Sequence, residues 1–117
     1  MNLKPTSYPK ENELPKLVRD NIPTLYQKRA GKIAQTRIAK SDTEYLKYLL
    51  KKVTEEATEV KHSLKHNNLL EEIADVYEVI EAILKLKGWS LKDVKKIQNS
   101  KREKNGGFNK RIILLTK

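Results

Sequence analysis

The longest amphipathic segment of the chain is SDTEYLKYLLKKVTEEATEVKHSLK, residues 41–65. Its apolar side chains recur at steps of three and four residues, which is the spacing of an amphipathic helix. The stripe they form consists of Leu46, Leu49, Leu50, Val53, Ala57, Val60 and Leu64. Ser41 and Glu44 have the S-x-x-E spacing of a capping box. We therefore expect one long helix over residues 42–65.

A second stretch with the same periodicity follows at once, LLEEIADVYEVIEAILKLKG at residues 69–88. Its apolar stripe consists of Leu69, Ile73, Val76, Ile80, Ile83 and Leu84. Gly88 is suited to end this helix, and an apolar residue just past such a glycine commonly packs on the last turn. We accordingly expect Trp89 to pack against Leu84. The short connection KHNN favours an antiparallel hairpin of the two helices.

Shorter elements are expected on both sides of this hairpin. Pro23 and Gly31 suit the start and the end of a short helix over residues 22–30. Ser90 and Asp93 open a further helix, which the Asn-Gly-Gly at 105–107 ends.

The β-branched segments near 33–39 and 111–115 suggest a small β-ribbon between them. The predicted fold class is mainly α, with the antiparallel long-helix hairpin forming a helical bundle. Residues 16–117 would be a single domain, preceded by a polar, proline-dotted arm at 1–15.

Composition limits the class of protein. The chain of 117 residues is 38% hydrophobic and 34% charged, as expected for a helix-rich globular domain. It contains no cysteine, so disulfides and thiolate metal sites are excluded. No apolar run approaches the roughly 20 residues of a membrane span. We expect a cytoplasmic protein with no membrane partner.

The net charge of +10 is distributed unevenly. Residues 1–41 carry nine basic and three acidic side chains, and residues 88–117 carry nine and two. The middle, residues 42–87, carries seven basic and ten acidic ones. Two basic ends therefore flank an acidic centre, and basic surfaces attract phosphates of any kind.

The acidic residues of the two long helices are not equivalent. At about 100° per residue, Glu56 and Glu59 lie roughly 70° and 130° to one side of the apolar stripe. Glu72 and Asp75 have the same offsets on the second helix, whereas Glu55 points to the opposite face. Two antiparallel helices are viewed from opposite ends, so the sense of rotation around one is the reverse of that around the other. Residues with equal angular offsets from the two apolar stripes therefore meet on the same side of the pair. We expect Glu59 to lie level with Glu72, and Glu56 level with Asp75.

Four converging carboxylates would repel one another, by roughly 3 kcal/mol for two charges about 5 Å apart at an effective dielectric near 20. Solvated acidic faces relieve this with lysines one helical turn away. The expectation is that none of the four acids is relieved in this way by its own helix. A hard divalent cation would compensate them, and oxygen-only ligands suit magnesium or manganese. His62 and His66 have a zinc-like spacing, but we expect both to be solvated.

The pattern E-E-x-x-E, twelve residues, then E-x-x-D resembles the signature of the all-α nucleoside triphosphate pyrophosphohydrolases, which include the MazG-like enzymes. KLVRDNIP at 16–23 and KREKNGGFNKRIILL at 101–115 resemble the phosphoribosyl-ATP pyrophosphohydrolase-like subgroup. The resemblance covers residues 16–115 and gives no role to the N-terminal arm.

The resemblance implies magnesium-dependent cleavage between the α- and β-phosphates of a nucleoside triphosphate. It makes Glu56, Glu59, Glu72 and Asp75 the metal ligands and catalytic carboxylates. Substrate-binding candidates in the basic blocks are Lys16, Arg19, Asn21, Lys101, Arg102, Lys104 and Asn105. The family usually builds its bundle from two subunits, so a homodimer is expected, or a tetramer.

Two alternatives remain open at this stage. The positive charge also fits a non-enzymatic nucleic-acid-binding module. The chain has only one Phe and one Trp for stacking on bases, and this reading leaves the acidic edge unexplained. A family member that has lost activity and serves a regulatory role is the other alternative. The presence of all four acidic residues argues against it.

Overall fold

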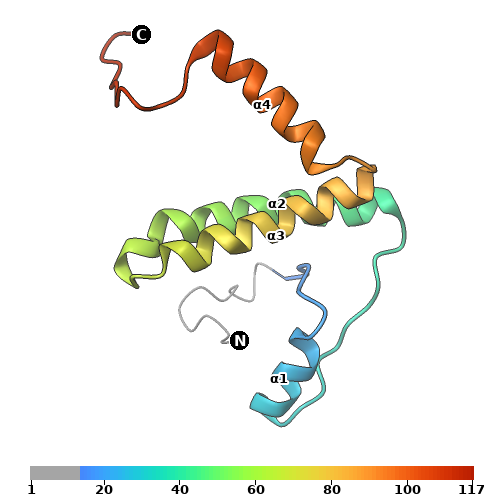
Figure 1. Cartoon of the computed structure of the whole chain (residues 1–117). Coiled ribbons are helices and arrows are strands. Elements are labelled where there is room, and N and C mark those ends of the chain that lie inside the picture. The colour runs from blue at the N-terminus through green and yellow to red at the C-terminus, as the bar shows by residue number, and fades with distance from the viewer. Residues whose placement is uncertain (1–13) are drawn as a thin grey trace.

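A computed structural model describes residues 14–117 of the chain. Its helices, in chain order, are α1 (Ile22–Ala30), α2 (Asp42–His62), α3 (Leu69–Lys87) and α4 (Leu91–Asn105), as Figure 1 shows. A 3₁₀ turn, Ser63–Lys65, follows α2. The mainly helical class is therefore confirmed, with helix bounds close to those expected. Most of the predicted N-terminal arm lies outside the described residues.

Helices α2 and α3 lie side by side and run in opposite directions (Figure 1). Ser41 caps the start of α2, where its hydroxyl accepts a hydrogen bond of 3.1 Å from the Glu44 N–H. The Glu44 carboxylate accepts from the Lys40 N–H rather than from Ser41, at 2.8 Å, so the box is offset by one residue. At the end of α3, Gly88 adopts φ 73°, a left-handed conformation that favours glycine.

The seam between α2 and α3 is displaced from the predicted apolar stripes toward the acidic residues. Buried positions recur every seven residues, the repeat of two long helices packed along a seam. They are Leu49 and Glu56 on α2, Ser63 in the 3₁₀ turn that follows it, and Glu72 and Val79 on α3. Leu49 and Val79 are the only buried apolar side chains among residues 14–117.

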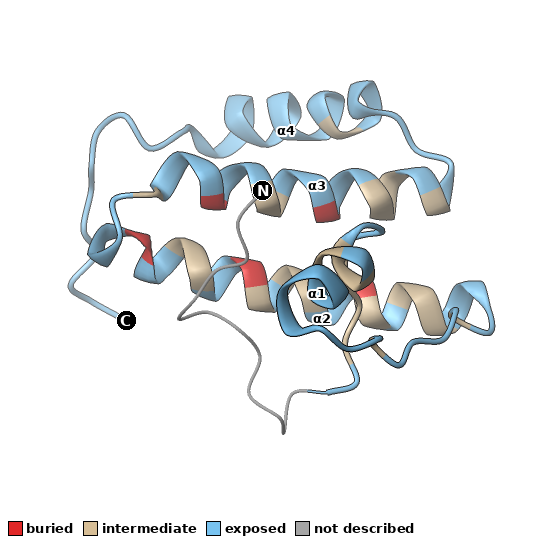
Figure 2. Cartoon of the chain, turned by 90° about the horizontal axis from the view of Figure 1, so that it is seen from below, coloured by how far each residue is buried: buried red, intermediate tan, exposed pale blue. Residues whose placement is uncertain are grey.

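Part of each predicted stripe is consequently uncovered. Leu50 and Leu64 are 53% and 82% exposed, and Ile73 and Ile80 are each 36% exposed. Buried and half-buried positions occupy the facing sides of α2 and α3, whereas their outer sides are exposed (Figure 2). The hairpin thus carries an apolar face that is left uncovered among residues 14–117.

Trp89 follows Gly88, where an apolar residue is expected to pack on Leu84. The Trp89 N–H donates to the Leu84 carbonyl at 2.9 Å, so the backbone part of the helix end forms as expected. Trp89 is 55% exposed, so its side chain is only partly covered. The chain turns at this point to begin α4.

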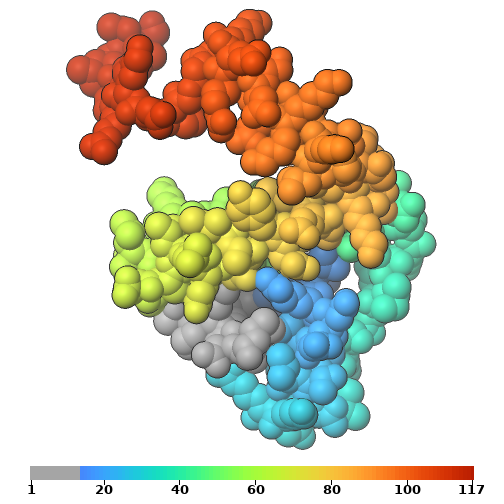
Figure 3. All heavy atoms as spheres, viewed as in Figure 1, coloured from blue at the N-terminus to red at the C-terminus, as the bar shows by residue number. Residues whose placement is uncertain are grey.

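Helix α4 projects from the rest of the molecule. A complete capping box starts it, with the Ser90 and Asp93 side chains each bonded to the other's backbone N–H. Bonds from Ser90 lower the pKa of the Asp93 carboxyl. Figure 3 shows α4 and the C-terminal tail standing clear of the hairpin, and all of their residues except Val94 are exposed.

The predicted β-ribbon is absent: neither 33–39 nor 111–115 forms a strand in the described part of the chain. The first segment links α1 to α2, and the second follows α4 on the far side of the hairpin (Figure 1). A lone two-stranded ribbon is marginal in water. The two segments, being far apart, have no opportunity to pair.

The overall shape is open. The Cα radius of gyration is 17.5 Å, whereas a compact chain of this length is expected near about 13 Å. Within residues 14–117, no helix combines the length and the apolar character that crossing a membrane requires.

Candidate metal centre

Three of the four predicted carboxylates meet between the long helices. Glu56 comes from α2, and Glu72 and Asp75 come from α3. Each offers one oxygen such that the three atoms lie within 4.8 Å of one another. Glu56 is 7% exposed and Glu72 only 2%, while Asp75 is half-buried. These three residues form what we call the acidic triad.

The fourth predicted residue, Glu59, is half-buried and does not belong to the acidic triad. The displaced seam explains the difference. It passes through Glu56 of α2 and Ser63 of the following 3₁₀ turn, so Glu56 is turned into the interior while Glu59 lies at the border of the interface. The four carboxylates were predicted to be equivalent, whereas in the structure three of them cluster and Glu59 lies apart.

Two basic residues of the N-terminal segment reach the acidic edge of the hairpin. The Arg19 Nη2 donates a 2.7 Å hydrogen bond to Asp75 Oδ1. The Lys16 Nζ lies 3.6 Å from Glu55 Oε1. Both were predicted as phosphate ligands from the resemblance alone. The structure places them beside the acidic residues, which makes residues 16–19 a basic strap across this edge.

Lys52 lies next to the acidic triad and was not among the residues predicted for this site. Its Nζ lies 3.9 Å from Glu56 Oε1 and 3.3 Å from Glu55 Oε1. None of the four acidic residues was expected to have a lysine one turn away on its own helix to offset its charge, and this expectation is wrong for Glu56. The signal was present in the sequence, because Lys52 precedes Glu56 by four residues, the spacing at which helical side chains meet.

The remaining predicted substrate-binding residues do not join this site within one chain. Asn21 precedes the first turn of α1 and is exposed. Lys101, Arg102, Lys104 and Asn105 are exposed on the last part of α4. Helix α4 leaves the hairpin on the side opposite α1 (Figure 1).

The acidic triad fits a hard divalent cation. Its donors are carboxylate oxygens alone, the ligand type that magnesium and manganese take in proteins. Two of the three side chains are more than nine-tenths buried, so their charge is poorly screened by water. His62 and His66 are exposed and stand outside the triad, as expected.

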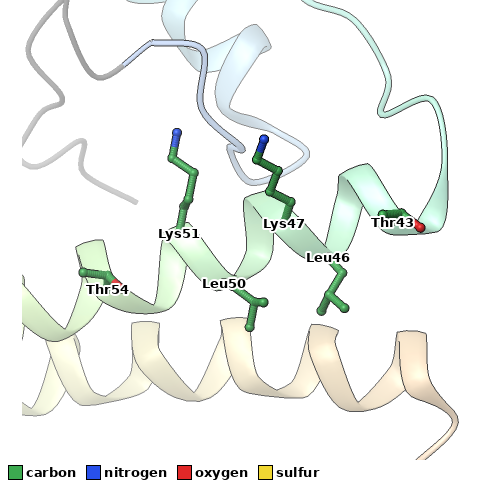
Figure 4. Close-up of a pocket in the computed structure, with 6 residues that line it drawn as sticks. All are labelled: Thr43, Leu46, Lys47, Leu50, Lys51 and Thr54. Carbon is green, nitrogen blue, oxygen red and sulfur yellow. The ribbon is translucent and has the colours of Figure 1, made fainter.

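An open pocket of about 470 Å³ lies elsewhere, on the first half of α2. Its lining consists of Thr43, Leu46, Lys47, Leu50, Lys51 and Thr54. In Figure 4 the two lysines point to one side of α2, whereas Leu46 and Leu50 point toward α3. No member of the acidic triad lines this pocket, which belongs to the uncovered surface of the helix.

Comparison with protein-family models, curated proteins and solved structures gives no match to this chain. The resemblance described above therefore stays a prediction from sequence, and the functional argument depends on the site itself.

Proposed function

We propose that this protein is a magnesium-dependent nucleoside triphosphate pyrophosphohydrolase. The observation that carries the proposal is the acidic triad, in which buried carboxylates from two facing helices approach within 4.8 Å. Burying charges of one sign together is costly unless a counter-charge is supplied. The order of the basic and acidic blocks resembles that in the MazG-like and phosphoribosyl-ATP pyrophosphohydrolase-like enzymes. This resemblance is the reason for proposing pyrophosphohydrolysis as the reaction.

In this proposal Glu56, Glu72 and Asp75 hold the cation. A bound divalent cation neutralises phosphate charge and makes a water molecule easier to deprotonate. Glu59, at the border of the same interface, would accept the proton of the attacking water. Attack on the α-phosphorus forms a new P–O bond and breaks the bond to the bridging oxygen. Pyrophosphate then leaves with the electron pair, and a nucleoside monophosphate remains.

Phosphate recognition would begin with the basic strap. Lys16 and Arg19 already lie at the acidic edge, through contacts to Glu55 and Asp75. Arginine suits this role because its planar fork can donate two hydrogen bonds to a phosphate. Lys16 and Arg19 would bind the negatively charged phosphates on the solvent-accessible side of Asp75.

We also propose that the working form is a homodimer. The chain leaves large apolar side chains exposed on α2, α3, α4 and its C-terminal tail, among them Leu50, Tyr77, Trp89, Ile97 and Ile113. Its radius of gyration exceeds that of a compact domain of the same length. Packing against a second copy would cover this surface. It would also allow α4 of one copy to bring Lys101 and Arg102 to the site of the other.

The test is release of pyrophosphate by the purified full chain with Mg²⁺, across canonical and modified triphosphates and phosphoribosyl-ATP. Glu56→Gln and Asp75→Asn should each lower the rate by roughly 100-fold or more, because each removes a charge from the triad. Glu71→Gln alters an exposed acid next to Glu72 and should retain the rate. Equal rates for all four proteins, or salt-sensitive nucleic-acid binding without hydrolysis, would refute the proposal.

A further inference from the structure

The N-terminal segment supplies a cation to the acidic triad from far away in the sequence. Arg19 and Asp75 are 56 residues apart, yet their side chains are joined by a hydrogen bond of 2.7 Å. No helix of the chain contains Arg19, which lies just before α1. The contact is therefore a tertiary one that holds a segment without regular structure against the hairpin.

The Asp75 carboxylate could also bind a divalent cation. Asp75 is the most accessible member of the acidic triad, since Glu56 and Glu72 are buried. A cation entering the triad from solvent would meet Asp75 first. The guanidinium of Arg19 lies 2.7 Å from Oδ1 of this carboxylate, so a cation bound by Asp75 would lie close to a second positive group and be repelled by it.

We propose that Arg19 and a divalent cation are alternative partners of Asp75, so that metal binding releases the basic strap. This inference rests on the proposed function and deepens it. Without metal, Arg19 neutralises Asp75 and keeps residues 16–19 on the hairpin. With metal, the guanidinium is displaced and becomes a free donor beside the site, where a phosphate can take the place of the lost carboxylate. Strap release and phosphate capture are thereby coupled to metal binding.

The neighbouring contact of Lys16 provides a matched control. Lys16 lies in the same strap and carries the same charge, and its Nζ lies 3.6 Å from Glu55, which is not a member of the triad. Arg19→Gln and Lys16→Gln therefore remove equal charge from the same segment. The first removes the guanidinium that donates to Asp75 of the triad. Because the Arg19 side chain is 44% exposed, its substitution leaves the helix packing in place.

The experiment measures Mn²⁺ binding to the full chain by loss of the free-ion electron paramagnetic resonance signal. Arg19→Gln should bind Mn²⁺ roughly tenfold more tightly than the unaltered protein, a factor that corresponds to one lost charge-assisted hydrogen bond. Lys16→Gln should bind within about twofold of the unaltered protein, as expected for a screened surface charge.

Hydrogen exchange gives a second readout that does not depend on activity. Saturating Mn²⁺ should speed amide exchange at residues 16–21 of the unaltered protein, because the strap is released. In Arg19→Gln the exchange there should be fast without metal.

The outcomes separate the two proposals. Equal Mn²⁺ affinities for Arg19→Gln and the unaltered protein, or an equal gain in Lys16→Gln, would overturn the role of Arg19 while leaving the metal centre intact. Failure of all three proteins to bind Mn²⁺ would overturn the metal centre and, with it, the inference.

Discussion

At the scale of single residues, the unusual feature is that charge occupies the helix seam. Of the five buried residues in the described part of the chain, two are glutamates and only two are apolar. Burying a carboxylate costs desolvation energy, and burying a second beside it adds repulsion. Arg19 and Lys52 offset part of this cost at the rim, at 2.7 Å from Asp75 Oδ1 and 3.9 Å from Glu56 Oε1 respectively.

Glu72 gives the sharpest test of the buried charge. Glu72→Gln keeps the shape of the side chain but removes a charge that is 2% exposed. We expect Mg²⁺ to stabilise this variant less than the unaltered protein, by about 1–2 kcal/mol in the free energy of unfolding, because a triad with one charge fewer binds the cation more weakly. Urea denaturation followed by circular dichroism measures the difference.

The control for that measurement is Glu71→Gln, which changes an exposed acid one residue away and should shift stability by less than about 0.5 kcal/mol. The gain in stability that Mg²⁺ gives to Glu71→Gln should match that of the unaltered protein, because the triad is intact. An equal gain in Glu72→Gln and the unaltered protein would contradict a role for Glu72 in cation binding.

At the scale of elements, the start of α2 is held by more than its helix cap. Arg37 forms two hydrogen bonds to the Glu44 carboxylate, at 2.7 and 3.0 Å. The carboxylate also accepts the Lys40 N–H. These bonds, with the Arg37 contact the largest contribution, lower the pKa of Glu44 from about 4.5 to about 2. They fasten the linker after α1 to the first turn of the long helix.

The pH dependence follows from the direction of that shift. A carboxylate whose pKa is depressed by folding stabilises the folded state above its ordinary pKa, and this contribution disappears as pH falls to the folded value. We expect Glu44→Gln to be less stable than the unaltered protein at pH 7. The gap should shrink from pH 4.5 toward pH 2, and it can be followed by urea midpoints in this range.

Asp42→Asn, which removes a carboxylate from the same first turn, serves as the control. A gap between Glu44→Gln and the unaltered protein that stays constant down to pH 2 would show that the Arg37 contact does not carry the effect.

At the scale of the whole molecule, the chain has too little core for its size. A domain of this length normally buries about two-thirds of the surface of its unfolded chain. Here α4 and the tail stand clear of the hairpin (Figure 3), and the apolar face of α2 and α3 is open. A helical face that is apolar and uncovered is a common mark of an interface.

We expect the protein in solution to have twice its chain mass of 13.6 kDa, as measured by light scattering on a sizing column. Ile80→Arg places a charge on the open apolar face and should shift the protein toward the single-chain mass. Glu81→Arg introduces the same residue at the adjacent exposed position and should leave the mass unchanged. A single-chain mass for the unaltered protein at all concentrations would contradict the dimer.

The sequence by itself determined the helices. Their ends depend on local chemistry, such as the Ser41 and Ser90 caps and the left-handed turns at Gly31 and Gly88, and local chemistry can be read from neighbouring residues. It also identified the acidic side of the hairpin, because the helical period fixes which residues share a face. Lys52 was within reach of the same reasoning and was overlooked.

How far each helix is turned about its axis depends on tertiary packing. That rotation depends on the partner surface, which periodicity does not describe, and it separates Glu59 from the triad and leaves Ile73 and Ile80 exposed. The contact between Arg19 and Asp75 joins residues 56 positions apart, so no local pattern specifies it. The missing β-ribbon has the same cause, since pairing requires that two distant segments be brought together, and the path of α4 keeps them apart.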